Sequence, residues 1–392
     1  MVGAGSVRSR RVVRPLTLAC AFYTCYYGAS ACLMPFLAVY YSDLGFNGGQ
    51  IGVLRGISPV VTLVAAPLWS ALADVTRRHK LLWLIAIAGS WGAVLALAST
   101  SSYGLLLGIV VAHAFLGAPV MPLADSAVIS LLGEQKDLYG TQRLWGAVGW
   151  GLSGLIIGFV TEHFGLVWSF VGYLVLMACG GLLVAMVPAT GSVARQHSNY
   201  GRDVRRLLSN PAWLAFLASS LCGGLYLTVE MNFLMLYMAS LGAGESLMGI
   251  ALVVSTLGEL PVWALAPYLL RRLGPRGLFA VALLSGTIQG IAFSVVTTPW
   301  LILPIQLLHG LAFSAAWTAG VAYVARVAPE GTQATAQGLY GGVMMGLAAT
   351  IGAVVGGRLF DQIGGAMTFR LAAIAPLIAL GLLWLGTRRQ LR

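Results

Sequence analysis

Residues 16–41 read LTLACAFYTCYYGASACLMPFLAVYY, a stretch in which no side chain is charged. A helix needs about 20 predominantly apolar residues to cross the hydrocarbon core of a bilayer, so this run is long enough for one span. The apolar core of a cleavable signal peptide has only about 7–15 residues. We therefore predict that the run from Leu16 is a true membrane-spanning helix.

The apolar character of this run extends over the whole chain. Of its 392 residues, 58% are hydrophobic and only 9% are charged. Soluble domains carry about 25% charged residues, so a soluble enzyme of this size is excluded. Intrinsic disorder needs low hydrophobicity and high net charge, and is excluded by the same numbers. The composition leaves an integral membrane protein.

Twelve apolar runs are long enough to span a bilayer, which predicts an all-α membrane protein. They cover residues 16–41, 50–73, 81–99, 103–132, 143–161 and 166–187 in the first half, and 212–240, 247–270, 278–297, 300–327, 333–357 and 367–386 in the second. A polar stretch at 188–211 separates the halves. We expect two six-helix bundles, 1–187 and 212–392, joined by a cytoplasmic linker.

The basic residues indicate the orientation of these spans. The chain has 23 Lys and Arg against 12 Asp and Glu, a net charge of +11. All but Arg55, Arg358 and Arg370 fall in tails and loops that twelve spans place on one side of the membrane. Cytoplasmic loops are enriched in Lys and Arg, so we expect both termini in the cytoplasm, in a plasma or inner membrane. Because the charges are spread over several short loops, they do not indicate nucleic-acid binding.

The two halves carry an internal repeat. With an offset of 197 residues, eight positions of the first half coincide with identical residues of the second: Cys25, Met34, Phe36, Leu37, Tyr40, Leu44, Gly45 and Gly52. Two six-helix halves in parallel repeat are an architecture of secondary transporters, in which the solute site lies near the bilayer midplane at the repeat interface. The pattern favours a transporter.

The loop after the second apolar run resembles a motif of the major facilitator superfamily. After the second run, Asp74 precedes the basic residues Arg77 and Arg78, which is similar to the superfamily's signature between spans two and three, although its usual leading Gly is Ser70 here. The resemblance implies that this loop braces one gating state. The alternative is that its charges only fix the topology.

A second motif resembles one branch of that superfamily. Asp125 is followed at 139–151 by YGTQRLWGAVGWG, a pattern similar to that of lactose permease, nucleoside–proton symporters and phenylpropionate transporters. The resemblance implies alternating access, with Asp125, Arg143 and Trp145 binding the solute. The alternative for Asp125 and Arg143 is a salt bridge that only joins two helix ends.

Charges within the spans are the candidates for energy coupling. An ionisable side chain inside a membrane costs roughly 2.5–3.5 kcal/mol on insertion scales, so each is a functional candidate. A desolvated carboxylate can load and release a proton near neutral pH. By resemblance to span eight of the same branch, Glu259 is the first choice as proton carrier. Glu230 is the second, with His309 beside them. The alternatives are a Glu230–Arg55 pair and a His309 bond to a backbone carbonyl.

Aromatic residues complete the predicted solute site. Tyr27, Tyr226 and Trp317 lie within spans and offer flat faces for a sugar ring or an aromatic solute. Most aromatic residues of membrane helices serve packing or the interface instead, and that alternative stays open for each of them.

The sequence thus predicts a secondary transporter, most simply a proton-coupled symporter of a small organic solute such as a sugar, a nucleoside or an aromatic acid. The alternatives are a uniporter or exporter, and a membrane sensor or partner-binding subunit that transports nothing. The motifs of nucleotide-driven pumps, zinc proteases and serine hydrolases do not occur, so we expect no enzyme activity. We expect no cofactor, no metal and no obligate protein partner. The five cysteines form no C-x-x-C pair and predict no disulfide.

Overall fold

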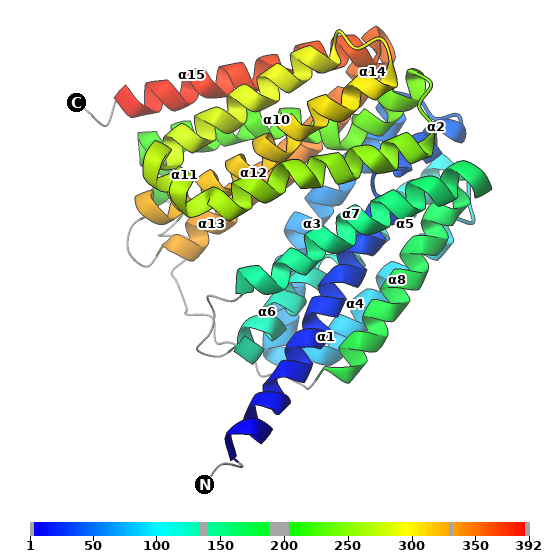
Figure 1. Ribbon diagram of the computed structural model, residues 1–392, viewed down its shortest axis with the longest axis vertical. Helices are drawn as coiled ribbons and strands as arrows, with labels where there is room; N and C mark the ends of the chain where they lie inside the picture. Colours follow the sequence, from blue (N-terminus) through cyan, green and yellow to red (C-terminus); the bar gives the residue numbers. More distant parts are fainter. Residues whose placement is uncertain (1–3, 133–138, 188–203, 205, 329–331, 389–392) are drawn as a thin grey trace. The chain divides into compact units, whose positions relative to one another are not determined.

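The computed structural model describes residues 4–132, 139–187, 204, 206–328 and 332–388 (Figure 1). In that part of the chain, ten helical segments are long and apolar enough to cross a membrane. The predicted all-α membrane class is confirmed, whereas the count of twelve spans stays a prediction. Six of the basic residues behind the predicted orientation lie outside the described residues: Lys136, Arg195, Arg202, Arg205, Arg389 and Arg392.

The chain forms two compact units. Unit 1 comprises Met1–Leu37 and Val61–Arg195, and unit 2 comprises Ala38–Val60 and Gln196–Arg392. Helix α3 (Gly48–Thr76) therefore contributes its first part to unit 2 and its remainder to unit 1. The sequence placed all of residues 1–187 in one bundle. Most of the predicted linker at 188–211 lies outside the described residues, so the division there stays a prediction.

Unit 1 is built on helix α1, which packs against α7 and α8, while α4 packs against α5 and α8 (Figure 1). Proline sets one of its breaks, because the predicted run 103–132 divides just before Pro119, which has no N–H to donate. The helices of this unit are α1 (Ala4–Leu33), α4 (His79–Leu97), α5 (Tyr103–Gly117), α6 (Val120–Leu132), α7 (Tyr139–Phe164) and α8 (Val167–Met186).

Glycine residues allow the backbones of helices α1 and α7 to come into contact. A Cβ atom on Gly149 would overlap the backbone of Thr24, and one on Gly28 would lie only 2.5 Å from Oγ of Ser153. Backbone atoms cannot move aside as the end of a flexible side chain can. This crossing therefore requires glycine, and it holds α1 and α7 at the short separation that the site described below needs.

Unit 2 is centred on α11 and α12, which pack closely together, and on α10, which packs against α14 and α15 (Figure 1). Its buried core includes Trp213, Phe216 and Tyr340. Its helices are α2 (Leu37–Asp43), the start of α3, α10 (Pro211–Ser240), α11 (Glu245–Phe293), the short 3-10 helix η2 (Pro299–Leu301), α12 (Ile302–Val327), α13 (Gln333–Gly341), the π-helical η3 (Gly342–Leu347), α14 (Ala348–Ala372) and α15 (Ile374–Arg388).

The start of α3 is fixed to α14 by glycine contacts and a carboxylate. A Cβ atom on Gly52 would overlap the carbonyl of Ala353. Asp361 accepts hydrogen bonds from the backbone N–H groups of Gly48 and Gly49, the latter at 2.8 Å. A carboxylate at a helix N-terminus satisfies unpaired N–H groups and complements the positive end of the helix dipole.

The backbone geometry repeats between the halves. Among the described residues, positive φ angles occur in three pairs with similar values: Gly45 and Gly242 (85° and 82°), Arg77 and Gly274 (55° and 67°), and Gly165 and Gly364 (92° and 74°). The first two pairs are separated by 197 residues, the offset that aligns the sequences, and the third by 199. Left-handed conformations are rare outside glycine. Their recurrence at spacings of 197 and 199 residues is independent support for the internal repeat.

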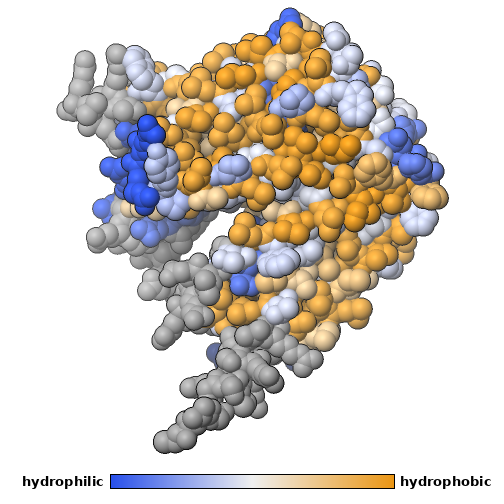
Figure 2. All heavy atoms as spheres, viewed as in Figure 1, coloured by the Kyte–Doolittle hydropathy of each residue, from blue (hydrophilic) through white to orange (hydrophobic). Residues whose placement is uncertain are grey.

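The surface of both units is apolar. Hydrophobic residues cover most of the face seen in Figure 2. Large apolar side chains stand open on it, among them Phe164 and Leu182, which are 69% and 68% exposed. Water-soluble proteins rarely expose contiguous apolar patches of this kind, so the surface is suited to lipid.

The α1–α7 crossing gives a first prediction. Replacing Gly149 by Val places two methyl groups against the backbone of Thr24, and we expect it to destabilise the protein by about 1–3 kcal/mol, as overpacking does. Thermal unfolding in detergent measures the effect. Gly108→Val in α5 is the matched control, because Gly108 is exposed and a Cβ there meets nothing within 4 Å. Equal melting temperatures for the two variants would contradict the crossing.

Candidate functional site

Unit 1 contains an ion pair between α6 and α7. Nη1 of Arg143 lies 3.3 Å from Oδ2 of Asp125, and the two side chains are 42% and 26% exposed. The contact that the sequence predicted between these residues is therefore present. Both side chains are therefore only partly buried.

Tyrosine hydroxyls surround this pair. Tyr23 donates a hydrogen bond to Oδ1 of Asp125 at 2.7 Å, and Arg143 donates to the hydroxyls of Tyr139 and Tyr27 at 2.8 and 2.9 Å. We call these five residues the Asp125–Arg143 cluster. Its charged groups sum to zero, and its polar atoms are the hydroxyl, guanidinium and carboxylate groups that bind neutral hydroxylated molecules.

Local packing explains why Tyr27 reaches Arg143. Gly146, which follows Arg143 by almost one helical turn, lies flat against the Tyr27 ring, so that a Cβ there would come within 2.5 Å of the ring. Trp145 is 49% exposed, and its backbone carbonyl accepts a hydrogen bond from Thr24. The structure thus brings Tyr27 to Arg143 at the crossing of α1 and α7, whereas for Trp145 only the backbone carbonyl is placed there, so the predicted role of its indole stays a prediction.

Sequence reasoning missed Tyr23 and Tyr139. Tyr23 precedes Tyr27 by one helical turn and so shares its face of α1, which is a detectable signal. Tyr139 is the first residue of the motif at 139–151. Tyr23 is fully buried, and its hydroxyl is committed to the Asp125 carboxylate. It therefore orients that group.

The predicted gating loop lies between α3 and α4. Asp74 lies 3.4 Å from Nε2 of His79. Arg77 has a left-handed backbone, with φ of 55°, and makes the turn. Lys80 donates to the carbonyls of residues 185 and 187 at the end of α8, both at 2.7 Å. The loop is thus bonded within unit 1.

Unit 2 contains a second, more deeply buried pair. Oε2 of Glu230 in α10 lies 2.8 Å from Nδ1 of His309 in α12, and the two residues are 2% and 8% exposed. Neither atom makes an aligned hydrogen bond to any described group, and their contact is an ion pair when His309 is protonated. The predicted alternative partner, Arg55, donates from Nε to Asn232 at 2.6 Å.

Glu259 completes the acidic group of unit 2. It interacts electrostatically with His309 and with Glu230, and its Oε2 accepts a hydrogen bond from the indole of Trp263 at 3.3 Å. The residues next to Glu259 and His309 form the closest approach of α11 to α12. There, a Cβ on Gly310 would overlap the backbone at Gly258 and Glu259. The structure therefore brings together all three residues predicted for proton coupling.

Three further buried polar residues join this group, and we call the whole the Glu230–His309 cluster. Gln306 donates to Oε1 of Glu230 at 2.9 Å, Gln289 donates to Gln306 at 3.2 Å, and the Tyr226 hydroxyl donates to Gln289 at 3.0 Å. Tyr226 is 1% exposed, and its ring is enclosed within unit 2. Its position favours a place in this network over contact with a solute.

The remaining aromatic candidate, Trp317, lies partly buried in α12. Its ring centroid is 6.3 Å from that of Tyr340 in α13. No described interaction connects it to the Glu230–His309 cluster, so its predicted role in solute binding stays a prediction.

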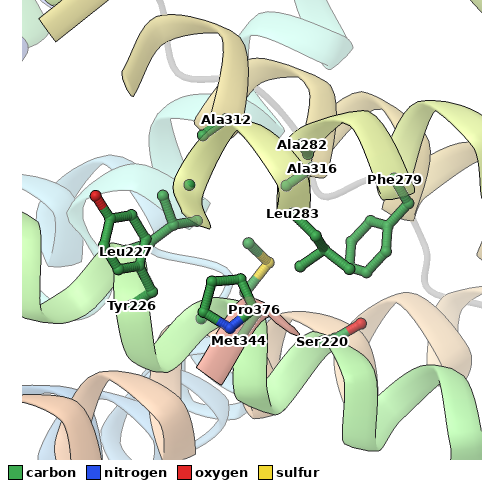
Figure 3. Close-up of a pocket in the computed structure, with 13 residues that line it drawn as sticks. Ser220, Tyr226, Leu227, Phe279, Ala282, Leu283, Ala312, Ala316, Met344 and Pro376 are labelled. Carbon is green, nitrogen blue, oxygen red and sulfur yellow. The ribbon is translucent and has the colours of Figure 1, made fainter. Parts of the chain in front are cut away.

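A small cavity lies inside unit 2, but it is too small for a solute. Its volume is about 10 Å³, room for about one water molecule, and its walls are largely apolar. Figure 3 shows the Tyr226 ring at one end of it, with the hydroxyl directed away from the other labelled side chains. Within the described residues, no group of three or more His, Cys, Asp or Glu side chains is arranged to hold a metal ion.

The comparison with known proteins identifies the family. The model of the MFS_1 like family matches residues 16–371. The chain belongs to this family of the major facilitator superfamily. It is accordingly a membrane transporter with multiple spanning helices, as the motifs predicted.

Relatives of known name cover almost the whole chain. The maltose permease of Geobacillus stearothermophilus is 30% identical over 97% of this chain and 96% of its own length. The probable 3-phenylpropionic acid transporter of Escherichia coli (strain K12) is 25% identical over 91% and 94%. The crystal structure of the nucleoside transporter NupG superposes with a TM-score of 0.84 at 16% identity, covering 95% and 99%, which shows the fold. The resemblance to this branch of the superfamily is confirmed.

Proposed function

We propose that this protein is a proton-coupled symporter of a neutral, hydroxyl-rich solute, in the chemical class of a disaccharide. The observation that carries the proposal is the Glu230–His309 pair with Glu259 beside it. Two carboxylates and an imidazole on three neighbouring helices, buried in an apolar unit, cost free energy that a passive carrier does not need to spend. Titratable groups make that cost useful, because they can carry a proton.

The solute class follows from the chemistry of the Asp125–Arg143 cluster. Asp125 accepts hydroxyl hydrogens, the planar fork of Arg143 donates to hydroxyl oxygens, and their charges cancel. An aromatic acid carries a carboxylate. The positive charge of Arg143 is already balanced by Asp125, so the cluster offers that carboxylate no unpaired positive charge. The identity to the maltose permease also supports a sugar. Tyr27 and Trp145 would pack against a sugar ring at this site.

We further propose that the chain crosses the membrane twelve times with both termini in the cytoplasm. Two of the ten long segments, Glu245–Phe293 and Thr335–Leu385, have 49 and 51 residues, enough for two crossings each. Each contains one left-handed glycine, Gly274 and Gly364. Their repeat counterparts in the first half, Arg77 and Gly165, lie between separate helices. Because the two halves repeat, a break in the helical backbone at Gly274 or Gly364 corresponds to a loop between two spans, as at Arg77 and Gly165.

Cysteine labelling tests this topology. In a chain whose native cysteines are replaced by serine, Arg271→Cys and, in the equivalent loop of the first half, Arg78→Cys should react with a membrane-impermeant maleimide only from the cytoplasmic side. We expect Gln362→Cys and its counterpart His163→Cys to react only from the other side. All four positions are exposed. Labelling of Arg271→Cys and Gln362→Cys from the same side would overturn the twelve-span topology.

Uptake into proteoliposomes tests the coupling. A pH gradient of one unit supports about tenfold accumulation of a neutral solute that moves with one proton, because both correspond to about 1.4 kcal/mol. We expect radiolabelled maltose to accumulate to that extent, and Glu259→Gln to abolish accumulation while exchange across equal concentrations continues. Glu245→Gln at the start of the same helix is the control. Wild-type uptake that only equalises the two concentrations would indicate a uniporter.

Competition in the same vesicles tests the solute class. We expect unlabelled maltose to compete strongly with labelled maltose, and phenylpropionate and uridine to compete weakly. Arg143→Lys keeps the charge but loses the planar fork, so it should weaken maltose binding by about tenfold or more, the loss expected when a charged hydrogen bond is removed. Strong competition by phenylpropionate alone would reassign the solute to the aromatic acids.

A further inference from the structure

The carboxylate of Glu230 has two oxygens in different surroundings. Oε1 accepts a hydrogen bond from Gln306 at 2.9 Å. Oε2 lies 2.8 Å from Nδ1 of His309, and among the described residues it makes no aligned hydrogen bond. One oxygen is therefore committed to an amide donor, and the other faces a group that can carry a proton.

The hydrogen bonds that lead to Oε1 all run toward it. The Tyr226 hydroxyl donates to Oε1 of Gln289, Nε2 of Gln289 donates to Oε1 of Gln306, and Nε2 of Gln306 donates to Glu230. An amide that accepts through its oxygen must offer its nitrogen at the other end. A proton placed on Oε1 of Glu230 would meet the N–H of Gln306, and a hydrogen bond there would require the buried side-chain amides of Gln306 and Gln289 to turn over together.

Packing holds the far end of the series in place. The Tyr226 ring lies between Gly286 and Gly290, where Cβ atoms would come within 3.0 and 2.7 Å of it, so its hydroxyl is directed at Gln289 between them. Tyr226 and Glu230 are one helical turn apart on α10. The series thus starts and ends on the same face of one helix, and Tyr226, Gln289, Gln306 and Glu230 are at most 2% exposed.

We propose that Gln306 is a positioning residue that reserves Oε1 of Glu230 as a hydrogen-bond acceptor, so that Glu230 exchanges its proton only through Oε2 with Nδ1 of His309. In that step the Nδ1–H bond of the imidazolium breaks and the Oε2–H bond of the carboxylic acid forms. The pair passes from two charges to none without gaining or losing a proton. The titratable groups that face this exchange are Glu259 from α11 and Tyr226 from α10. The inference rests on the proposed coupling role of Glu230.

The first test removes the amide. Gln306→Leu leaves the carboxylate without its fixed donor, and loss of a hydrogen bond to the charged form favours protonation. We expect the pH at which maltose accumulation falls to half to move about one unit toward alkaline pH, about tenfold in proton affinity. Tyr237→Phe is the matched control, because it also removes a buried hydrogen bond of α10 in unit 2, at 2.8 Å. It should lower the melting temperature and leave the pH profile unchanged.

The second test exchanges the two partners. The double variant Glu230→Gln with Gln306→Glu keeps a hydrogen bond at every link of the series, with the last one reversed, and keeps the total charge, but moves the carboxylate away from His309. We expect it to fold with near wild-type stability, to exchange maltose, and not to accumulate it. This variant stays informative if Gln306→Leu fails to fold. Full accumulation by the double variant would overturn the positioning role.

A third readout separates this inference from the proposed function. Infrared pH titration of the purified protein detects the C=O band of a protonated carboxylic acid, and the part lost in Glu230→Gln belongs to Glu230. We expect Gln306→Leu to move the pH midpoint of that band toward alkaline pH, by the same amount as it moves the pH midpoint of maltose accumulation. If the wild-type protein does not accumulate solute but the band moves, the coupling proposal fails and the role of Gln306 stands. If neither profile moves, the inference is wrong.

Discussion

The cost of burying charge in an apolar environment governs this molecule. Water is not available inside a spanning helix bundle to solvate an ion, so each buried ion must find a partner or give up its charge. Unit 2 meets this constraint by placing Glu230 against His309 and Gln306, deep among apolar residues of three helices. Unit 1 meets it differently, because Asp125 and Arg143 lie nearer the surface and share their charge with tyrosine hydroxyls. This difference in burial is the basis of the division of tasks that we propose, with proton exchange in unit 2 and recognition of a polar solute in unit 1.

Glycine makes both arrangements possible. Polar side chains of moderate length meet only if the helix axes come close together, and a single methyl group at the crossing would separate them. Gly149 at the α1–α7 crossing and Gly310 at the α11–α12 crossing each lie against backbone atoms. In each case the contact is within two turns of a charged side chain of the cluster, Arg143 or His309. The stability of the helix packing and the geometry of the clusters thus depend on the same positions.

Much of the fold was predictable from the sequence, because length and apolarity decide whether a segment can span a membrane. The runs at 50–73, 81–99 and 166–187 correspond closely to α3, α4 and α8. The predictions differ where a break depends on one residue. The first run is divided around Pro35, and the separate runs at 247–270 and 278–297 form one helical element in which only Gly274 leaves the helical conformation. Periodicity carries no signal for such single-residue events.

The charged residues of the candidate site were predictable from the sequence, and their neutral hydrogen-bond partners were not. An Asp, Glu or Arg in an apolar run stands out by its cost, so Asp125, Arg143, Glu230 and Glu259 were all identified. Gln289 and Gln306 stand out less, because a neutral amide is cheaper to bury and follows no periodic pattern. Which residues share hydrogen bonds depends on rotation and separation of the helices, and these quantities appear only in three dimensions.

The contact between Gly258 and Gly310 has a mechanical consequence. Two helices whose main chains touch have no layer of side chains between them that could repack, so sliding or tilting one against the other would require atoms to overlap. We therefore expect helices α11 and α12 to move together as one rigid body near this point. Any rearrangement during the working cycle would therefore carry Glu259 and His309 together at a constant spacing.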